Sequence, residues 1–211
     1  YTWVCAPVQL DKLQKAFFLL MALVGELTAT IAVLQWLPLD AISPIWMVVL
    51  EPGARSAGNL GQPNQTATLI LMGLAALAWA YERGLTGGVG LAVGAAWMAV
   101  AVGTTQSRAA VLSVVVVSGF LLAHSHYRSL RLRPLHIVGW LAFLGLWMGV
   151  LQPGLSDLLL MSGARSFEVG VDGARVTIWS QMLHGIWHSP WVGYGVSATP
   201  SGFHGNPPNS H

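Results

Sequence analysis

Four polar clusters in the sequence contain residue types that could bind an anion or move a proton. The first runs from Arg55 through Gly58, Gly61 and Gln62 to Asn64, directly before an apolar stretch. Asn64 could cap a helix that starts there, and free backbone N–H groups at such a helix end, with an arginine nearby, suit an anion. The same residues would also serve as a plain loop and helix cap, so both interpretations stay open.

The second cluster, residues 104–108, links two apolar segments through a few polar residues and ends in Ser107 and Arg108. A guanidinium at a membrane edge is costly unless it is paired or bound to an anion, and its planar fork matches phosphate oxygens. The alternative is an arginine whose side chain simply extends to the membrane surface. We favour an anion contact at Arg108.

The third cluster is a candidate amphipathic helix. Arg175, Trp179 and Leu183 recur every four residues, so we expect them on one face of a helix that ends before Pro190. Such a helix could contribute Arg175 to a site, or it could lie at the membrane surface as an anchor.

The fourth cluster consists of histidines. His184 and His188 are four residues apart, but no glutamate of the metalloprotease arrangement lies between them and no third ligand is obvious. We therefore predict no metal site. A histidine of the closing loop, His204 or His211, could instead act as a general base, since an unperturbed imidazole has a pKa of about 6.5.

The composition indicates that these clusters belong to a membrane protein. Of 211 residues, 54% are hydrophobic and 9% are charged, and the mean hydropathy is +0.60. A soluble domain carries about 25% charged residues. These values exclude an ordinary soluble enzyme and a disordered chain, and the net charge of only +2 argues against a nucleic-acid partner. A single cysteine, Cys5, excludes a disulfide framework.

We predict an all-α polytopic membrane protein with about five transmembrane helices and a long periplasmic loop region that contains short helices. Residues 1–151 would form the helical bundle and residues 152–211 the loop region. The expected spans lie near residues 16–37, 66–81, 85–104, 109–123 and 135–151. Glu26 falls inside the first span, where an ionisable group is either functional or a carboxyl that faces the bundle.

Basic residues predict the orientation. Six of the ten flank the same side of the predicted bundle: Lys12, Lys15, Arg83, Arg128, Arg131 and Arg133. The positive-inside rule makes that side cytoplasmic, so the polar clusters would face the periplasm across a bacterial inner membrane. The chain starts without an initiator Met or a signal peptide and stops in loop-like sequence, so we expect it to be part of a longer protein.

The clusters together resemble the O-antigen ligase/polymerase superfamily of bacterial inner-membrane glycan transferases. The matching segments are Gly58–Asn64 (G-N-x-x-Q-x-N), Ser107-Arg108 (S-R), Arg175 to Gly195 (R-x-x-x-W … P-x-x-G-x-G) and the terminal Asn209–His211, which resembles the start of an H-N motif without its second residue. The resemblance covers roughly residues 50–211. Within the superfamily, the sequence Gly-Gln-Pro-Asn at residues 61–64 is most similar to the bacterial protein O-oligosaccharyltransferases.

This resemblance implies a donor, an acceptor and roles for residues. The donor would be an undecaprenyl-diphosphate-linked glycan, and the acceptor a hydroxyl of a periplasmic, pilin-like protein. Lipid A–core, as in O-antigen ligases, or a growing O-antigen chain, as in polymerases, is the alternative acceptor. The residues expected at the donor diphosphate are Arg108, Arg175, Arg55, Ser107, Gln62 and Asn64, and those expected as general base are His211 and, as runner-up, His204. The lipid bilayer is the only other partner, and no metal or cofactor is expected.

Two other classes of protein remain as alternatives. A transporter or flippase for a lipid-linked or anionic solute could use Arg108 and Glu26 along its path, although most polar groups of this sequence gather in loops on one side rather than in mid-membrane. A structural membrane subunit would leave Arg55, Arg108 and Arg175 dispersed, whereas an enzyme requires at least two of them to converge.

Overall fold

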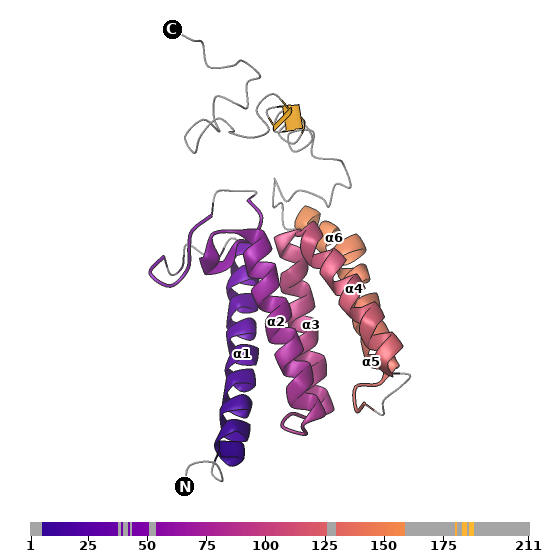
Figure 1. The fold of residues 1–211 in the computed structure, drawn as a ribbon. Coiled ribbons are helices and arrows are strands. Elements are labelled where there is room, and N and C mark those ends of the chain that lie inside the picture. Colours follow the sequence, from indigo (N-terminus) through magenta and orange to yellow (C-terminus); the bar gives the residue numbers. More distant parts are fainter. Residues whose placement is uncertain are drawn as a thin grey trace. The chain divides into compact units, whose positions relative to one another are not determined.

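The computed structural model describes residues 6–37, 39, 42, 44–50, 54–125, 130–158, 180, 183–184 and 186–187. The chain divides into two compact units, residues 1–167 and 168–211. In the described part of the first unit, every regular element is helical (Figure 1). The description below concerns that unit.

The first three long helices pack closely against one another. They are α1 (Ala6–Trp36), α2 (Pro63–Glu82) and α3 (Gly88–Thr105). Glycines set the approach of α1 and α2, since a Cβ built on Gly73 would lie 2.6 Å from the Cα of Gly25. Small residues at helix crossings are typical of membrane bundles, because they let two backbones come into contact.

The next two helices, α4 and α5, run antiparallel to each other (Figure 1). Helix α4 (Arg108–Ser125) is followed by α5 (Pro134–Leu146), a π-helical turn (Trp147–Leu151) and α6 (Gln152–Leu158). In the π-helical turn, the N–H of Gln152 donates to the carbonyl of Trp147, five residues back. Pro153 follows directly, and proline both lacks an N–H and crowds the carbonyl four residues before it. The wider turn relieves that crowding, so the helix continues beyond residue 151, where we expected the last span to end.

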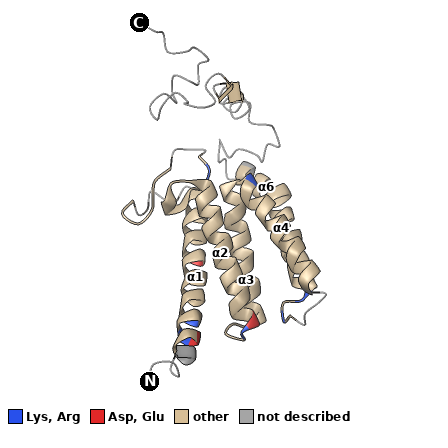
Figure 2. Ribbon diagram, in the orientation of Figure 1, with Lys and Arg blue, Asp and Glu red and all other residues tan. Residues whose placement is uncertain are grey.

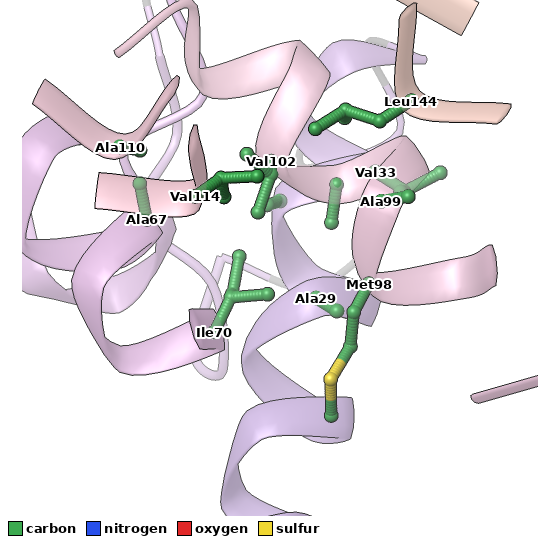
Figure 3. Close-up of a cluster of buried hydrophobic side chains, with 12 residues drawn as sticks. Ala29, Val33, Ala67, Ile70, Met98, Ala99, Val102, Ala110, Val114 and Leu144 are labelled. Atoms are coloured by element: carbon green, nitrogen blue, oxygen red, sulfur yellow. The ribbon is translucent and has the colours of Figure 1, made fainter. Parts of the chain in front are cut away.

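The hydrophobic core lies among α1, α2, α3 and α4, with a contribution from α5 (Figure 3). Its members are Ala29, Ala32, Val33, Ala67, Ile70, Met98, Ala99, Ala101, Val102, Ala110, Val114 and Leu144. Two tryptophans join the later helices to α3: the indole N–H of Trp140 donates to Ala95 and that of Trp147 donates to Val100, at 2.7 and 3.0 Å. Buried indole groups of this kind are ordinarily hydrogen-bonded.

The helices identify the chain as a helical membrane protein. Each of the five expected spans coincides with a helix. Within the described residues, three segments are long and apolar enough to cross a membrane: Gln9–Trp36, Gly88–Thr105 and Pro134–Ser156. Segment Arg108–His124 is apolar but shorter. Helix α2 has 20 residues, about the length that a span requires, but its two ends are polar.

Charged residues gather at the helix ends, apart from an acidic position in the middle of α1 (Figure 2). At one end, Arg131 brings the α4–α5 connection to the end of α2, because its backbone N–H donates to Glu82 and its guanidinium donates to the Tyr81 carbonyl, at 3.0 and 2.9 Å. The basic residues at this end are Lys12, Lys15, Arg83, Arg131 and Arg133. Arg128 lies outside the described residues.

The acidic position within α1 is Glu26. Its carboxylate oxygen Oε1 occupies the space beside Gly94 of α3 that any larger side chain would need. Glu26 is half-buried, so the carboxyl faces the bundle on one side only. Of the two interpretations of this residue, the arrangement favours the carboxyl that packs against a neighbouring helix.

Candidate functional site

The candidate site lies at the opposite end of the helices from the basic cluster. Four elements meet there: the last turn of α1, residues 54–62, the first turn of α2 and the turn between α3 and α4 (Figure 1). This end contains five of the residues that the sequence motifs single out: Arg55, Gln62, Asn64, Ser107 and Arg108.

The segment that follows Arg55 is fixed by hydrogen bonds to three helices. The Ser56 N–H donates to the Thr104 carbonyl at the end of α3, at 3.4 Å. The Ala57 carbonyl accepts from the Thr66 hydroxyl of α2. Ser56 and Thr66 are both buried. Arg55 itself is half-buried and starts this anchored segment.

Gln35, in the last turn of α1, completes the anchoring. Its Oε1 accepts from the N–H groups of Ala57 and Gly58 at 3.1 and 2.8 Å, and its Nε2 donates to the carbonyls of Val48 and Gly58 at 2.8 and 3.1 Å. The sequence motifs did not include Gln35. A polar residue within an otherwise apolar span was the signal that could have found it.

The glycines of the motif Gly58–Asn64 shape a tight turn. Gly58 and Gly61 have φ angles of +56° and +68°, a left-handed conformation that glycine adopts without strain. Asn59 lies between them, and its amide bonds to the backbone of Val48 and Trp46 at 3.2 and 2.7 Å. These three motif residues therefore have a structural role in closing the loop.

Asn64 connects the first two sequence clusters directly. The expectation that it caps the following helix is wrong, because α2 begins one residue earlier at Pro63 and its N-cap residue, Gln62, makes no side-chain cap bond. Asn64 instead accepts a hydrogen bond at its Oδ1 from the Ser107 hydroxyl, at 2.8 Å. Asn64 is the second residue of the helix, so its side chain is not in the N-cap position.

Ser107 holds the start of α4. Its Oγ accepts a hydrogen bond from the Ala110 N–H at 3.2 Å, which is the geometry of an N-cap. The same hydroxyl donates its hydrogen bond to Asn64. The side chain is only 1% exposed. Gln106 turns the chain into this position with a φ of +48°. Arg108, the first residue of α4, is by contrast exposed.

This arrangement can bind an anion. The N-terminal ends of α2 and α4 both lie here, and each brings the positive end of a helix dipole, although Pro63 has no N–H and Ser107 already accepts from the Ala110 N–H. Arg55 and Arg108 add guanidinium groups at the same end. Among the described side chains, the buried Ser56 hydroxyl has no hydrogen-bond partner, so it adds a polar atom next to Arg55.

The other predicted site residues belong to the second unit. Arg175, His204 and His211 lie outside the described residues, as does His188. In the second unit, Ser180, Leu183, His184, Ile186 and Trp187 are helical, within the stretch where an amphipathic helix was expected. The described part of the chain contains no group of three or more potential metal ligands.

The fold defines a helical membrane protein, and the candidate site is a cluster of polar and basic residues at one end of its bundle. The chain belongs to the O-antigen ligase family: the family model described as O-Antigen ligase matches residues 93–210, more than half of the chain. A second model, described as Protein glycosylation ligase, matches residues 57–79. The resemblance inferred from the motifs is thereby confirmed.

Two curated relatives come from Acinetobacter baylyi. A ComP-specific O-oligosaccharyltransferase is 27% identical over 195 residues, which cover 90% of this chain and 34% of the relative. A General O-oligosaccharyltransferase is 29% identical over 196 residues, which cover 86% of this chain and 33% of the relative. The chain thus spans about a third of the length of these relatives. No solved structure matches the chain significantly.

Proposed function

We propose that the protein is a membrane glycosyltransferase that moves an oligosaccharide from undecaprenyl diphosphate to a hydroxyl of a periplasmic acceptor. The observation that carries this proposal is the hydrogen bond between Asn64 and Ser107. Asn64 lies in the segment that matches a glycosylation ligase model, and Ser107 lies in the segment that matches the O-antigen ligase family. Their contact joins both segments at the end of the bundle where two helices begin.

In the proposed mechanism, arginines hold the donor diphosphate. Arg108 and Arg55 contribute from the described end of the bundle, with Ser107, Gln62 and Asn64 as further contacts. Arg175 is proposed as a third phosphate ligand on the strength of the family motif alone. Guanidinium groups bind phosphate oxygens in a bidentate fashion and stabilise the charge that develops as the diphosphate leaves. They supply the electrostatic stabilisation that divalent metals supply elsewhere, so we propose that transfer requires no metal.

The acceptor hydroxyl is proposed to attack the anomeric carbon of the glycan. His211, or His204 in its place, takes the hydroxyl proton as general base. A new bond forms between the acceptor oxygen and the anomeric carbon, while the bond from that carbon to the diphosphate oxygen breaks. The electron pair of the broken bond stays on undecaprenyl diphosphate, which is the leaving group.

A serine or threonine of a pilin-like protein is the acceptor we favour. Both curated relatives are named O-oligosaccharyltransferases, and one of them is named as specific for ComP. Ligation to lipid A–core or polymerisation of O-antigen units would use the same donor chemistry and is the alternative. We also propose that the basic end of the bundle is cytoplasmic and the site periplasmic in a bacterial inner membrane, following the positive-inside rule.

The test is a reconstituted transfer reaction. The purified protein in lipid nanodiscs receives an undecaprenyl-diphosphate oligosaccharide, a pilin-like peptide or lipid A–core in parallel, and a chelator. Glycan on the peptide supports a metal-independent protein oligosaccharyltransferase. Glycan on lipid A–core would indicate that the protein is an O-antigen ligase instead. If neither acceptor is modified and the donor stays intact, the proposals of protein glycosylation and of ligation fail, and a polymerase or a transporter becomes the better hypothesis.

The arginine roles are tested in the same assay. Arg108→Ala is expected to lower the transfer rate by about 100- to 1,000-fold, the effect of one lost charge-assisted contact in a preorganised site. Arg83→Ala is the matched control, because Arg83 is exposed at the opposite end of the bundle. An Arg108→Ala protein that is stable and transfers at the full rate would remove Arg108 from the mechanism.

A further inference from the structure

We propose that Gln35 is a positioning residue for the donor site, because it fixes the backbone that carries Arg55. The inference rests on the proposed function only for the role of Arg55 in binding the donor. The anchoring itself follows from the hydrogen bonds of α1 and stands apart from any activity.

The amide of Gln35 has every hydrogen bond that it can make. A glutamine side chain offers two acceptor sites and two donors. Its oxygen accepts from Ala57 and Gly58, and its nitrogen donates to Gly58 and Val48. The side chain is only 6% exposed. A fully satisfied buried amide of this kind holds its partners in one arrangement, since any other arrangement leaves polar groups unpaired.

The anchored segment is held from several sides. Ala57 donates to Gln35 of α1 and accepts from Thr66 of α2, and Ser56 donates to Thr104 of α3. Three consecutive backbone units are thus tied to three helices directly after Arg55. A flexible loop could not hold a guanidinium steadily, whereas this segment can.

Such positioning has a measurable consequence for transfer. A misplacement of about 1 Å in a substrate-binding group can cost on the order of 100-fold in rate. Loss of the Gln35 amide should therefore act through Arg55, even though Gln35 itself is buried beneath the loop and makes its bonds to backbone groups.

The first measurement is hydrogen exchange of residues 56–58 in nanodiscs. Gln35→Met keeps the length of the side chain but removes all four bonds, so exchange at Ala57 and Gly58 should accelerate about 10- to 100-fold. Gln35→Glu keeps the acceptor oxygen and loses the donor nitrogen, so it should give an intermediate acceleration. Gln14→Met is the matched control, because Gln14 is exposed on the same helix. Unchanged exchange in Gln35→Met would overturn the proposal.

The second measurement is a double-mutant cycle in the transfer assay. Gln35→Met should lower kcat/KM about 10- to 100-fold in the native protein and have little further effect once Arg55→Ala is present. A merely structural role would instead give the same factor in both backgrounds, and that additivity would overturn the link to Arg55. If the native protein transfers nothing, the proposed function fails, while faster exchange in Gln35→Met would still establish the anchoring.

Discussion

Replacing Ser107 by alanine tests whether the two motifs depend on each other for stability. The substitution removes the bond to Asn64 and the cap on the Ala110 N–H. Loss of an N-cap costs about 1 kcal/mol, and loss of a further hydrogen bond costs about 0.5–1.5 kcal/mol. Because Ser107 is 1% exposed, water cannot easily replace either partner. We therefore expect Ser107→Ala to lower the free energy of unfolding by about 2 kcal/mol.

Thermal unfolding in nanodiscs, followed by tryptophan fluorescence, measures this loss. At about 2–4 °C per kcal/mol for a chain of this size, the expected fall in Tm is about 4–8 °C. Ser113→Ala is the control on the same helix, because the exposed Ser113 hydroxyl donates to the Ala109 carbonyl of its own helix, at 2.9 Å. Its effect should stay within about 0.5 kcal/mol.

A double-mutant cycle then isolates the contact between the motifs. Asn64→Ala removes the acceptor of the same bond, so the combined variant should lose less stability than the sum of the single variants, by about 0.5–1.5 kcal/mol. Equal melting temperatures of Ser107→Ala and Ser113→Ala, or strictly additive losses in the cycle, would refute the reasoning.

Two further predictions concern helix packing. Gly73→Ala should lower Tm by several degrees, because its Cβ would lie 2.6 Å from the Gly25 Cα and force α1 from α2, whereas Gly139→Ala, with nothing within 4 Å of the new Cβ, should not destabilise. Gly103→Ala should shift the tryptophan fluorescence spectrum, because its Cβ would lie 2.6 Å from the Trp147 indole and displace it, and an unchanged spectrum would contradict the packing described here.

Hydropathy located the helices well but could not give their true ends. The first span was expected from residue 16, whereas α1 starts at Ala6. The extra turns contain Asp11, Lys12 and Lys15, which lower the hydropathy but favour a helix, since Asp11 and Lys15 pair at 2.6 Å one turn apart. Apolar runs report where a membrane lies, and helices continue beyond it when polar residues at their ends find local partners.

The last helix is also longer than its apolar stretch predicted, for a different physical reason. The apolar stretch predicted that this span ends near residue 151 and that a loop region starts at residue 152, and a proline at 153 would ordinarily end a helix. The π-helical turn before Pro153 removes the clash and lets the helix run on to Leu158. Gln152 is buried rather than exposed. No periodicity in the sequence distinguishes a helix that stops at a proline from one that widens by a residue before it.

For the site, the sequence identified the motif residues but not the framework that holds them. Arg55, Ser107 and Arg108 were expected on the same side of the predicted bundle, and in the structure they lie at one end of it. The contact between Asn64 and Ser107 joins residues 43 positions apart and could not be read from either segment alone. Gln35 was missed because a single amide in an apolar helix is compatible with many roles.

The motif residues divide into two groups by what their side chains contact. Asn64 and Ser107 are engaged with each other and with a helix end, so their replacement weakens the fold as well as any donor contact. Gln62 is exposed and makes no side-chain cap bond, so its replacement should leave stability nearly unchanged. Arg108 is exposed as well, and the unfolding of its alanine variant has to be measured alongside its activity. An inactive Asn64 or Ser107 variant therefore says little about chemistry until its unfolding has been measured. An inactive but stable Arg108 or Gln62 variant, by contrast, points directly to a lost contact with the donor.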